Sequence, residues 1–194
     1  MKYDINKPMT RSSRRVLTAV TEAFFGLLCE KSFENLSVSE ICDRSGYPRA
    51  TFYNYFDDKY DLLNFYWTVI SKMVGAEEYS RYPQDTVFDI YFERIYDLME
   101  ENEDKVELLM TNNMEDGYFL SSCRIFLAKS IKTMIEGTYS ASSVPVPINV
   151  LAEHYANTLL LVFRHRFGRK PSGFGREETR ANLYYLISGG HKII

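Results

Sequence analysis

The stretch RATFYNYFDDKYDLL, which begins at Arg49, combines aromatic rings with side chains that can hold a polyanion. The Arg49 side chain can donate a forked pair of hydrogen bonds to a guanine edge or to a phosphate. The hydroxyls of Thr51 and Tyr53 can donate to phosphate oxygens, and Asn54 can reach the edge of a base. Lys59 stands where another helix is expected to begin, and the free N–H groups there already favour an anion. The chemistry that this stretch indicates is nucleic-acid binding.

Helical spacing divides the same stretch into two faces. Phe52 and Phe56 are four residues apart, so they share one face, which we expect to be buried. Ala50 lies away from that face. Tyr55 is a candidate for contact with a groove, although its ring can also turn partly inward. The rings therefore divide between a core role and a surface role.

Two short helices that meet at a turn would present these side chains. Ser37 and Glu40 have the spacing of a capping box, which starts a helix, and Gly46 supplies its stop. Pro48 fits the first turn of the next helix, because its missing N–H costs nothing there. A longer amphipathic helix over residues 11–31 braces the pair. This layout is typical of a helix-turn-helix, whose second helix lies in the major groove.

Helical periodicity continues through the rest of the chain, and no sustained alternating pattern indicates strands. A long helix is expected from Asp58, as its N-cap, to about Glu77. The fold class is therefore all-α, with a three-helix helix-turn-helix domain at residues 1–57 and a C-terminal helical bundle at residues 58–194. The bundle helices are predicted at residues 87–101, 103–110, 120–139, 148–167 and 177–188.

Composition and charge limit the class of protein. The chain has 194 residues, of which 45% are hydrophobic and 25% charged, as in ordinary globular proteins. The net charge of −3 argues against polyanion binding by the whole surface, but residues 1–60 carry nine basic and eight acidic side chains. No apolar run approaches the roughly 20 residues that span a bilayer, and the N-terminus lacks a signal-peptide pattern. We therefore expect a cytoplasmic protein without membrane association.

No spacing of residues indicates a catalytic or metal site. The three histidines lack metal-ligand spacing such as H-E-x-x-H, and no Ser-His-Asp or Cys-His signature is present. The three cysteines stand far apart in apolar helical contexts, where a buried thiol is the first expectation and a redox sensor the alternative. The sequence predicts no enzyme activity, no cofactor and no metal.

The segment LSVSEICDRSGYPRATFYNYFDDKYDLL resembles the DNA-binding domain of the TetR family of transcriptional regulators. The recognition helix of that family ends in a T-x-Y-x-x-F-x-x-K pattern, and the glycine before it corresponds to Gly46. The resemblance covers about the first 65 residues, and the variant here looks closest to the branch that includes regulators of dihydroxyacetone kinase operons. The residues that match the pattern are Thr51, Tyr53, Phe56 and Lys59. The residues expected to contact DNA are Arg49, Ala50, Thr51, Tyr53, Asn54, Tyr55 and Lys59.

Some residues depart from the family pattern. Pro48 stands where a capping serine is usual, which removes a side-chain cap worth about 1 kcal/mol. Asp57 and Asp58 flank Lys59, and carboxylates near phosphates oppose binding unless they cap a helix. Tyr53 and Lys59 also have an alternative role as ordinary solvated surface. We expect the affinity for DNA to be modest and strongly salt-dependent.

The resemblance implies a homodimeric repressor that binds a palindromic operator in double-stranded DNA and is controlled by a small-molecule effector in its bundle. The alternative keeps the fold but lets the bundle dock a partner protein. Each aromatic side chain assigned to the effector pocket can instead be ordinary core. The expected pocket residues are Tyr91, Phe92, Tyr96, Phe119, Phe126, Tyr155 and Leu159. The expected dimer-interface residues are Leu160, Leu161, Arg164, Leu183, Leu186 and Ile187.

Overall fold

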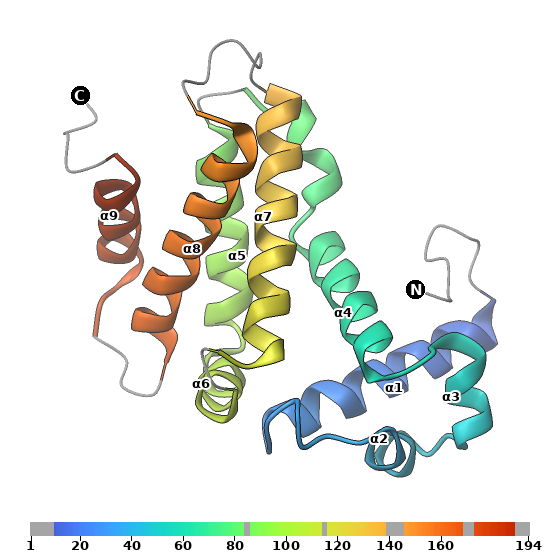
Figure 1. The fold of residues 1–194 in the computed structure, drawn as a ribbon. Coiled ribbons are helices and arrows are strands. Elements are labelled where there is room, and N and C mark those ends of the chain that lie inside the picture. Colours follow the sequence, from blue (N-terminus) through green and yellow to red (C-terminus); the bar gives the residue numbers. More distant parts are fainter. Residues whose placement is uncertain (1–9, 84–85, 114–115, 139–145, 169–172, 189–194) are drawn as a thin grey trace.

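The helical arrangement comes from a computed structural model that describes residues 10–83, 86–113, 116–138, 146–168 and 173–188. Every regular element in these residues is a helix, so the prediction of an all-α fold is confirmed for them (Figure 1). The N-terminal helices are α1 (Arg11–Leu28), α2 (Val38–Ser45) and α3 (Arg49–Tyr55). The helices that follow are α4 (Lys59–Met73), the short 3₁₀ helix η1 (Ala76–Arg81), α5 (Val87–Glu100), α6 (Glu103–Asn112), α7 (Tyr118–Thr138), α8 (Ile148–Phe167) and α9 (Arg176–Ile187).

Local capping fixes the two short helices of the N-terminal domain. The hydroxyl of Ser37 accepts from the backbone N–H of Glu40, and the Glu40 carboxylate accepts from the backbone N–H of Ser37, so the predicted capping box is confirmed. Gly46 ends α2 with a φ of 72°, a left-handed conformation that glycine adopts without strain. Pro48 is the residue before α3 rather than part of its first turn, and α3 has no side-chain cap.

The start of α4 is capped on both sides. A carboxylate oxygen of Asp58 accepts from the backbone N–H groups of Tyr60 and Asp61, at 2.9 and 2.8 Å. The Asp61 carboxylate in turn accepts from the backbone N–H of Asp57. Asp58 therefore has the capping role that the sequence predicts for it. The hydrogen bonds of this turn link the end of α3 to the start of α4.

The end of α4 differs from the prediction. The helix stops at Met73 and not at about Glu77, because Gly75 adopts a φ of 64° and turns the chain into η1. Gly75 is the left-handed residue just after the helix, a position that glycine occupies at little cost. A single glycine within an apolar helical pattern was too weak a signal to place this break.

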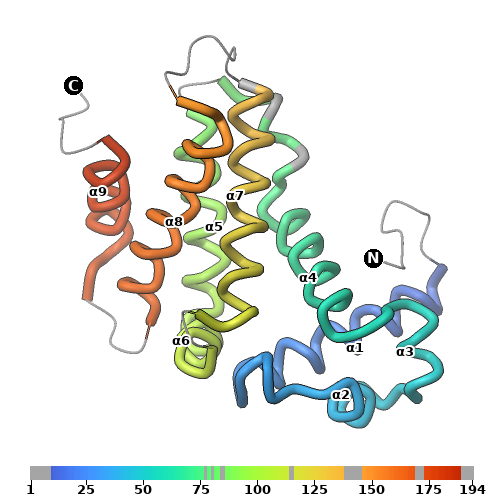
Figure 2. The backbone as a smooth tube through the Cα atoms, in the orientation of Figure 1, coloured from blue at the N-terminus to red at the C-terminus, as the bar shows by residue number. Residues whose placement is uncertain are grey.

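The chain forms a small N-terminal domain and a bundle, with α4 leading from one to the other (Figure 1; Figure 2). The first hydrophobic core joins α1, α2 and α3 to the first half of α4, and it also receives Phe119 and Leu120 of α7. The second core lies among α5, α7, α8 and α9. In both views α9 lies against α8 at the edge of the bundle farthest from α3. No helix in the described residues is long and apolar enough to cross a membrane.

A buried amide ties the bundle to the N-terminal domain. The side-chain oxygen of Asn113, at the end of α6, accepts from the backbone N–H of Phe33 at 2.9 Å. The Asn113 side-chain nitrogen donates to the carbonyls of Leu109 and Leu28, at 2.9 and 3.4 Å. One side chain thus satisfies backbone groups of α1, of the turn after α1 and of α6, so the two parts of the chain share polar contacts as well as apolar ones.

Candidate DNA-binding surface and ligand cavity

The helix α3 presents one face to solvent and buries the other. Phe52 and Phe56 are fully buried in the first core, as their spacing predicts. The phenol of Tyr53 is 44% exposed, and the Ala50 and Asn54 side chains are also exposed. Because α3 has no polar residue on its buried side, its hydrogen-bonding groups point outward or along its edges, where a nucleic acid can reach them.

The edges of α3 bind neighbouring helices. The Arg49 guanidinium donates to the Ser39 hydroxyl of α2, so this exposed side chain spans the two helices of the helix-turn-helix. The Tyr55 hydroxyl donates to the Ser13 hydroxyl of α1 at 3.2 Å, and the Tyr55 ring is half-buried. Of the two outcomes that the sequence leaves open for Tyr55, the structure has the inward one. Thr51 is half-buried on the same helix.

The Lys59 side chain contacts the protein itself, although the sequence predicts that it contacts DNA. Its ammonium donates to the backbone carbonyls of Phe33, Glu34 and Leu36, at 2.9, 3.0 and 2.8 Å, and it lies 4.8 Å from the centre of the Phe33 ring. An ammonium has three N–H donors, and these three bonds use all of them. Burial lowers the pKa of Lys59 below its usual value, although Glu34 and Asp58 act in the opposite direction. In this geometry Lys59 holds the turn between α1 and α2, and it has no donor left for a phosphate.

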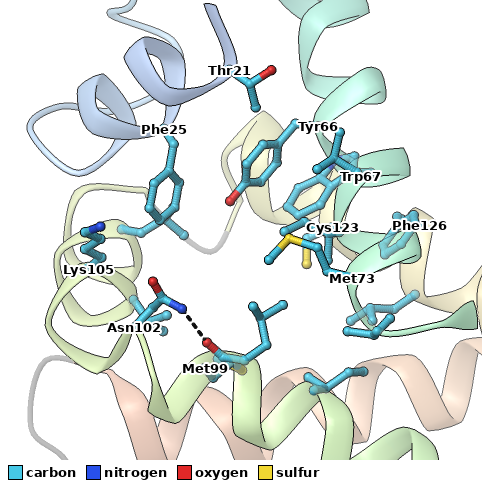
Figure 3. A pocket seen from close by; sticks show the side chains of 18 of the residues that line it. Thr21, Phe25, Tyr66, Trp67, Met73, Met99, Asn102, Lys105, Cys123 and Phe126 are labelled. Carbon is cyan, nitrogen blue, oxygen red and sulfur yellow. Dashed lines mark hydrogen bonds between the residues drawn. The ribbon is translucent and has the colours of Figure 1, made fainter. Parts of the chain in front are cut away.

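A cavity of about 980 Å³ lies between the N-terminal domain and the bundle (Figure 3). Its walls come from α1, α4, α5, α6, α7 and α8, and most of the lining side chains are apolar or aromatic. This volume is at the upper end of the range for small-molecule sites, roughly 300–1,000 Å³. Four of the residues that we expected in a pocket are among the lining residues: Tyr91, Phe119, Phe126 and Leu159.

The other three expected pocket residues pack elsewhere. Phe92 and Tyr96 are fully buried in the second core, where both rings contact Phe163. Tyr155 packs its ring against Phe88 at 5.5 Å. Their helices present another side to the cavity. These three residues therefore follow the alternative prediction, in which they are ordinary core residues.

Several cavity residues were not identified from the sequence. Phe25 of α1, Tyr66 and Trp67 of α4, and Lys105 of α6 all line the space (Figure 3). Their spacing in the sequence predicts that they lie on helices, but it does not indicate that α1 and α6 face the same cavity. Trp67 donates its indole N–H to the Ser122 hydroxyl of α7 at 2.7 Å, which fixes the indole ring at the wall.

The thiols show no sign of activation. Cys123 lines the cavity, and burial raises its pKa to about 12. Burial also raises the pKa of Cys29 and of Cys42. A reactive thiol needs a lowered pKa, so these environments favour buried structural cysteines over a redox sensor. Among the described residues, no group of three His, Cys, Asp or Glu side chains could hold a metal ion.

The outer edge formed by α8 and α9 carries exposed apolar side chains. Leu161 is 59% exposed and Leu186 is 44% exposed, and both were expected at a dimer interface. Tyr185, which was not predicted from the sequence, is 66% exposed and precedes Leu186. Leu160 and Leu183 are instead buried within the protomer, the former at the cavity wall. Arg164 and Ile187 are half-buried.

Comparison with known proteins bears on the N-terminal domain first. Residues 21–64 match the model of the family described as "Bacterial regulatory proteins, tetR family". The N-terminal domain belongs to the TetR family. The match extends from the middle of α1 into α4 and so contains the whole helix-turn-helix.

Solved structures resemble the whole chain in fold. A TetR transcriptional regulator from Streptococcus agalactiae 2603V is 20% identical, with a TM-score of 0.62, and the match covers 93% of this chain and 96% of that one. The dihydroxyacetone kinase operon activator DhaS is 15% identical, with a TM-score of 0.55, over 90% of this chain and 95% of that one. At these identities the likeness concerns the fold alone. A search of curated proteins finds no match.

The TetR-type domain gives α3 the place of a recognition helix. Its exposed face carries Tyr53 and Asn54, with Arg49 at the edge shared with α2. The family and the fold together support a DNA-binding transcriptional regulator.

Proposed function

We propose that this protein is a homodimeric repressor that binds a palindromic operator and leaves it when a small molecule fills the cavity. The observation that carries the proposal is the position of the cavity, whose walls include six residues of α1, from Arg14 to Phe25. A ligand there would touch the helix that braces the helix-turn-helix. The function is regulatory and not enzymatic, and it places the protein in the cytoplasm with the chromosome.

The coupling follows from what the ligand would touch. The helix α1 shares a core with α3, and α4 leads from α3 into the bundle. An occupant that bears on α1 and α4 together would bind one arrangement of these helices better than another, and it would shift the protein toward that arrangement. In a dimer, two recognition helices must lie roughly 34–36 Å apart to enter successive major grooves. A small rotation of each N-terminal domain would change this spacing.

The alternative, in which the bundle docks a partner protein, is less well supported. A docking role would be favoured by a bundle packed without a hollow, whereas this bundle borders a space of about 980 Å³. Apolar walls that face water in such a space would gain free energy when a small molecule covered them.

The DNA contact can be tested on the exposed face of α3. We expect Tyr53→Ala combined with Asn54→Ala to weaken binding to an operator fragment from the gene's own upstream region by at least about tenfold, since two contacts of roughly 1 kcal/mol each are lost. Asn64→Ala, an exposed asparagine on α4, serves as the matched control and should leave binding unchanged. Fluorescence anisotropy at two salt concentrations measures both effects. Equal binding by the double variant and the native protein would refute the role of α3.

The dimer can be tested on the edge formed by α8 and α9. We expect Leu161→Glu to raise the dimer dissociation constant by at least about tenfold, because a carboxylate would be buried without a partner. Ile125→Glu, at a site on α7 that is 70% exposed, serves as a control for the added charge. Light scattering across a dilution series gives the oligomeric state. A Leu161→Glu protein that stays dimeric at the same concentrations as the control would place the interface elsewhere.

A further inference from the structure

The cavity is apolar on one side and charged on the other. The walls from α4, α5, α7 and α8 carry aliphatic and aromatic side chains, with the tyrosine hydroxyls, the indole N–H and one thiol as their polar groups. The charged lining residues come only from α1 and α6. They are Arg14 and Glu22 on α1 and Lys105 on α6, and all three are exposed. A molecule that satisfied both sides would have an apolar body and a polar head.

Two hydrogen-bond donors meet at one ring on the charged side. The Phe25 ring stacks on the Tyr66 ring, with centroids 5.8 Å apart and an interplanar angle of 17°. The Lys105 ammonium lies 5.9 Å from the centre of the same Phe25 ring. Figure 3 shows Phe25 between Lys105 and Tyr66, with the Tyr66 hydroxyl pointing into the hollow. Phe25 therefore marks the place where a head group would find both donors.

Both donors are free of partners among the described residues. Neither a hydrogen bond to the Tyr66 hydroxyl nor an ion pair of Lys105 occurs within this part of the chain. Burial raises the pKa of Tyr66 well above its usual value, so its hydroxyl keeps its proton and can donate at any physiological pH. The hydroxyl borders the cavity, where water or a ligand can reach it. An acceptor on a ligand would satisfy it.

The sign of the head group follows from the charges at this edge. Lys105 is the cation on this side, with its ammonium 5.9 Å from the centre of the Phe25 ring, whereas Arg14 lies about three helical turns before Phe25 on α1. The carboxylate of Glu22 opposes an anion, and its side chain is exposed like that of Lys105, so water screens both charges. An anionic head fits this side better than a cation does, because the Lys105 ammonium and the Tyr66 hydroxyl can both donate to it. A small polyhydroxylated molecule fits poorly, because the apolar walls would remain hydrated around it.

We propose that the cavity binds an amphipathic monocarboxylate, with its hydrocarbon body against α4 and α7 and its carboxylate at Lys105 and Tyr66. This assignment rests on the proposed function only in treating the ligand as an effector. The carboxylate accepts from the ammonium and from the phenol, and a bond to a charged group is stronger than a neutral one. The hydrocarbon gains affinity from the apolar area that it removes from water.

The chain contains its own reporter for the test. Trp67 is the only tryptophan and lines the cavity, so its fluorescence responds to occupancy of this site. The probes are dodecanoate, 1-dodecanol and dodecyltrimethylammonium, which share one hydrocarbon chain and are used below the concentrations at which they aggregate. We expect dodecanoate to bind at least about tenfold more tightly than either of the others, as one charge-assisted hydrogen bond implies.

Variants separate the head-group contact from the apolar contact. We expect Lys105→Met to weaken the binding of dodecanoate by about tenfold and to change the affinity for 1-dodecanol by less than about twofold. Tyr66→Phe should weaken both probes that carry an acceptor. Lys129→Met, at an exposed lysine of α7 outside the cavity, is the matched control and should change neither.

Two outcomes would overturn the assignment. One is equal affinity for the carboxylate and the alcohol in the native protein. The other is an unchanged preference for dodecanoate in a folded Lys105→Met protein. Release of operator DNA is measured separately by anisotropy. Tight dodecanoate binding without DNA release would support the ligand class and refute effector control, so the two failures are distinguishable.

Discussion

Replacing Asn113 by alanine is expected to lower the free energy of unfolding by about 3 kcal/mol, as the loss of buried hydrogen bonds implies. Asn113 is only 2% exposed, so water cannot replace its amide. The variant would leave the buried N–H of Phe33 without an acceptor and the carbonyl of Leu109 without its side-chain donor. Leaving the N–H of Phe33 unsatisfied costs roughly 1–3 kcal/mol, whereas the Leu109 carbonyl keeps its bond from the backbone N–H of residue 113.

The neighbouring amide gives a matched control for this effect. Asn112 is half-buried and donates a single bond, to the carbonyl of Cys29 at 2.7 Å. We expect Asn112→Ala to cost only about 1 kcal/mol, because a single half-buried bond is lost. Urea unfolding with a constant m-value measures both losses. Equal losses for the two variants would show that the buried contacts of Asn113 do not stabilise the fold as the geometry implies.

The Asn113→Ala variant also tests regulation. Asn113 joins α6, a wall of the cavity, to the end of α1 and the turn after it. If a ligand acts on DNA by moving α1 relative to the bundle, loosening this contact should weaken the effect of the ligand on operator affinity while leaving ligand binding itself largely intact. Comparing operator affinity with and without ligand, in Asn113→Ala and in the native protein, measures this coupling.

Local sequence signals were enough to place most helices. The capping box at Ser37 and Glu40 and the cap at Asp58 involve only neighbours in the chain, and the structure has both. Pro147 and Gly168 flank α8, whose bounds are the predicted ones. The end of α4 was misplaced, because the effect of Gly75 depends on its φ angle and not on any residue pattern.

The site was harder to predict than the helices. Periodicity places Phe92 and Phe126 alike on inner faces, and only the packing of six helices puts Phe126 at a cavity and Phe92 in solid core. The contribution of α1 through Phe25 has no local signal at all, since its partner helices are distant in sequence. A helix face identifies what is buried but not what it is buried against.

Lys59 illustrates the same limit at the DNA-binding surface. A lysine at a helix start next to a recognition helix resembles a phosphate contact, and Tyr53, which matches the same pattern, is exposed as such a contact requires. The sequence cannot show that the turn after α1 brings three carbonyls, those of Phe33, Glu34 and Leu36, to the Lys59 ammonium. These carbonyls come from residues more than 20 positions away.

Replacing Lys59 by methionine is expected to lower the free energy of unfolding by about 2 kcal/mol, since three carbonyls lose a charged donor but regain some water. Methionine keeps the length of the side chain and its contact with the Phe33 ring while removing the ammonium. Lys72→Met, at an exposed lysine of α4, removes the same charge and should cost less than about 0.5 kcal/mol. Urea unfolding distinguishes the two.

The salt dependence of operator binding decides between the two roles of Lys59. If the lysine held a phosphate, Lys59→Met would reduce the slope of log affinity against log salt by about 0.9, the loss expected for one phosphate contact. Because its donors are used within the protein, we expect the slope to stay unchanged under conditions where the variant is folded. Affinity should fall only as far as the recognition helix loses its support. A reduced salt-dependence slope with unchanged stability would show that Lys59 contacts DNA, since only a contact with the phosphate changes the number of counterions released.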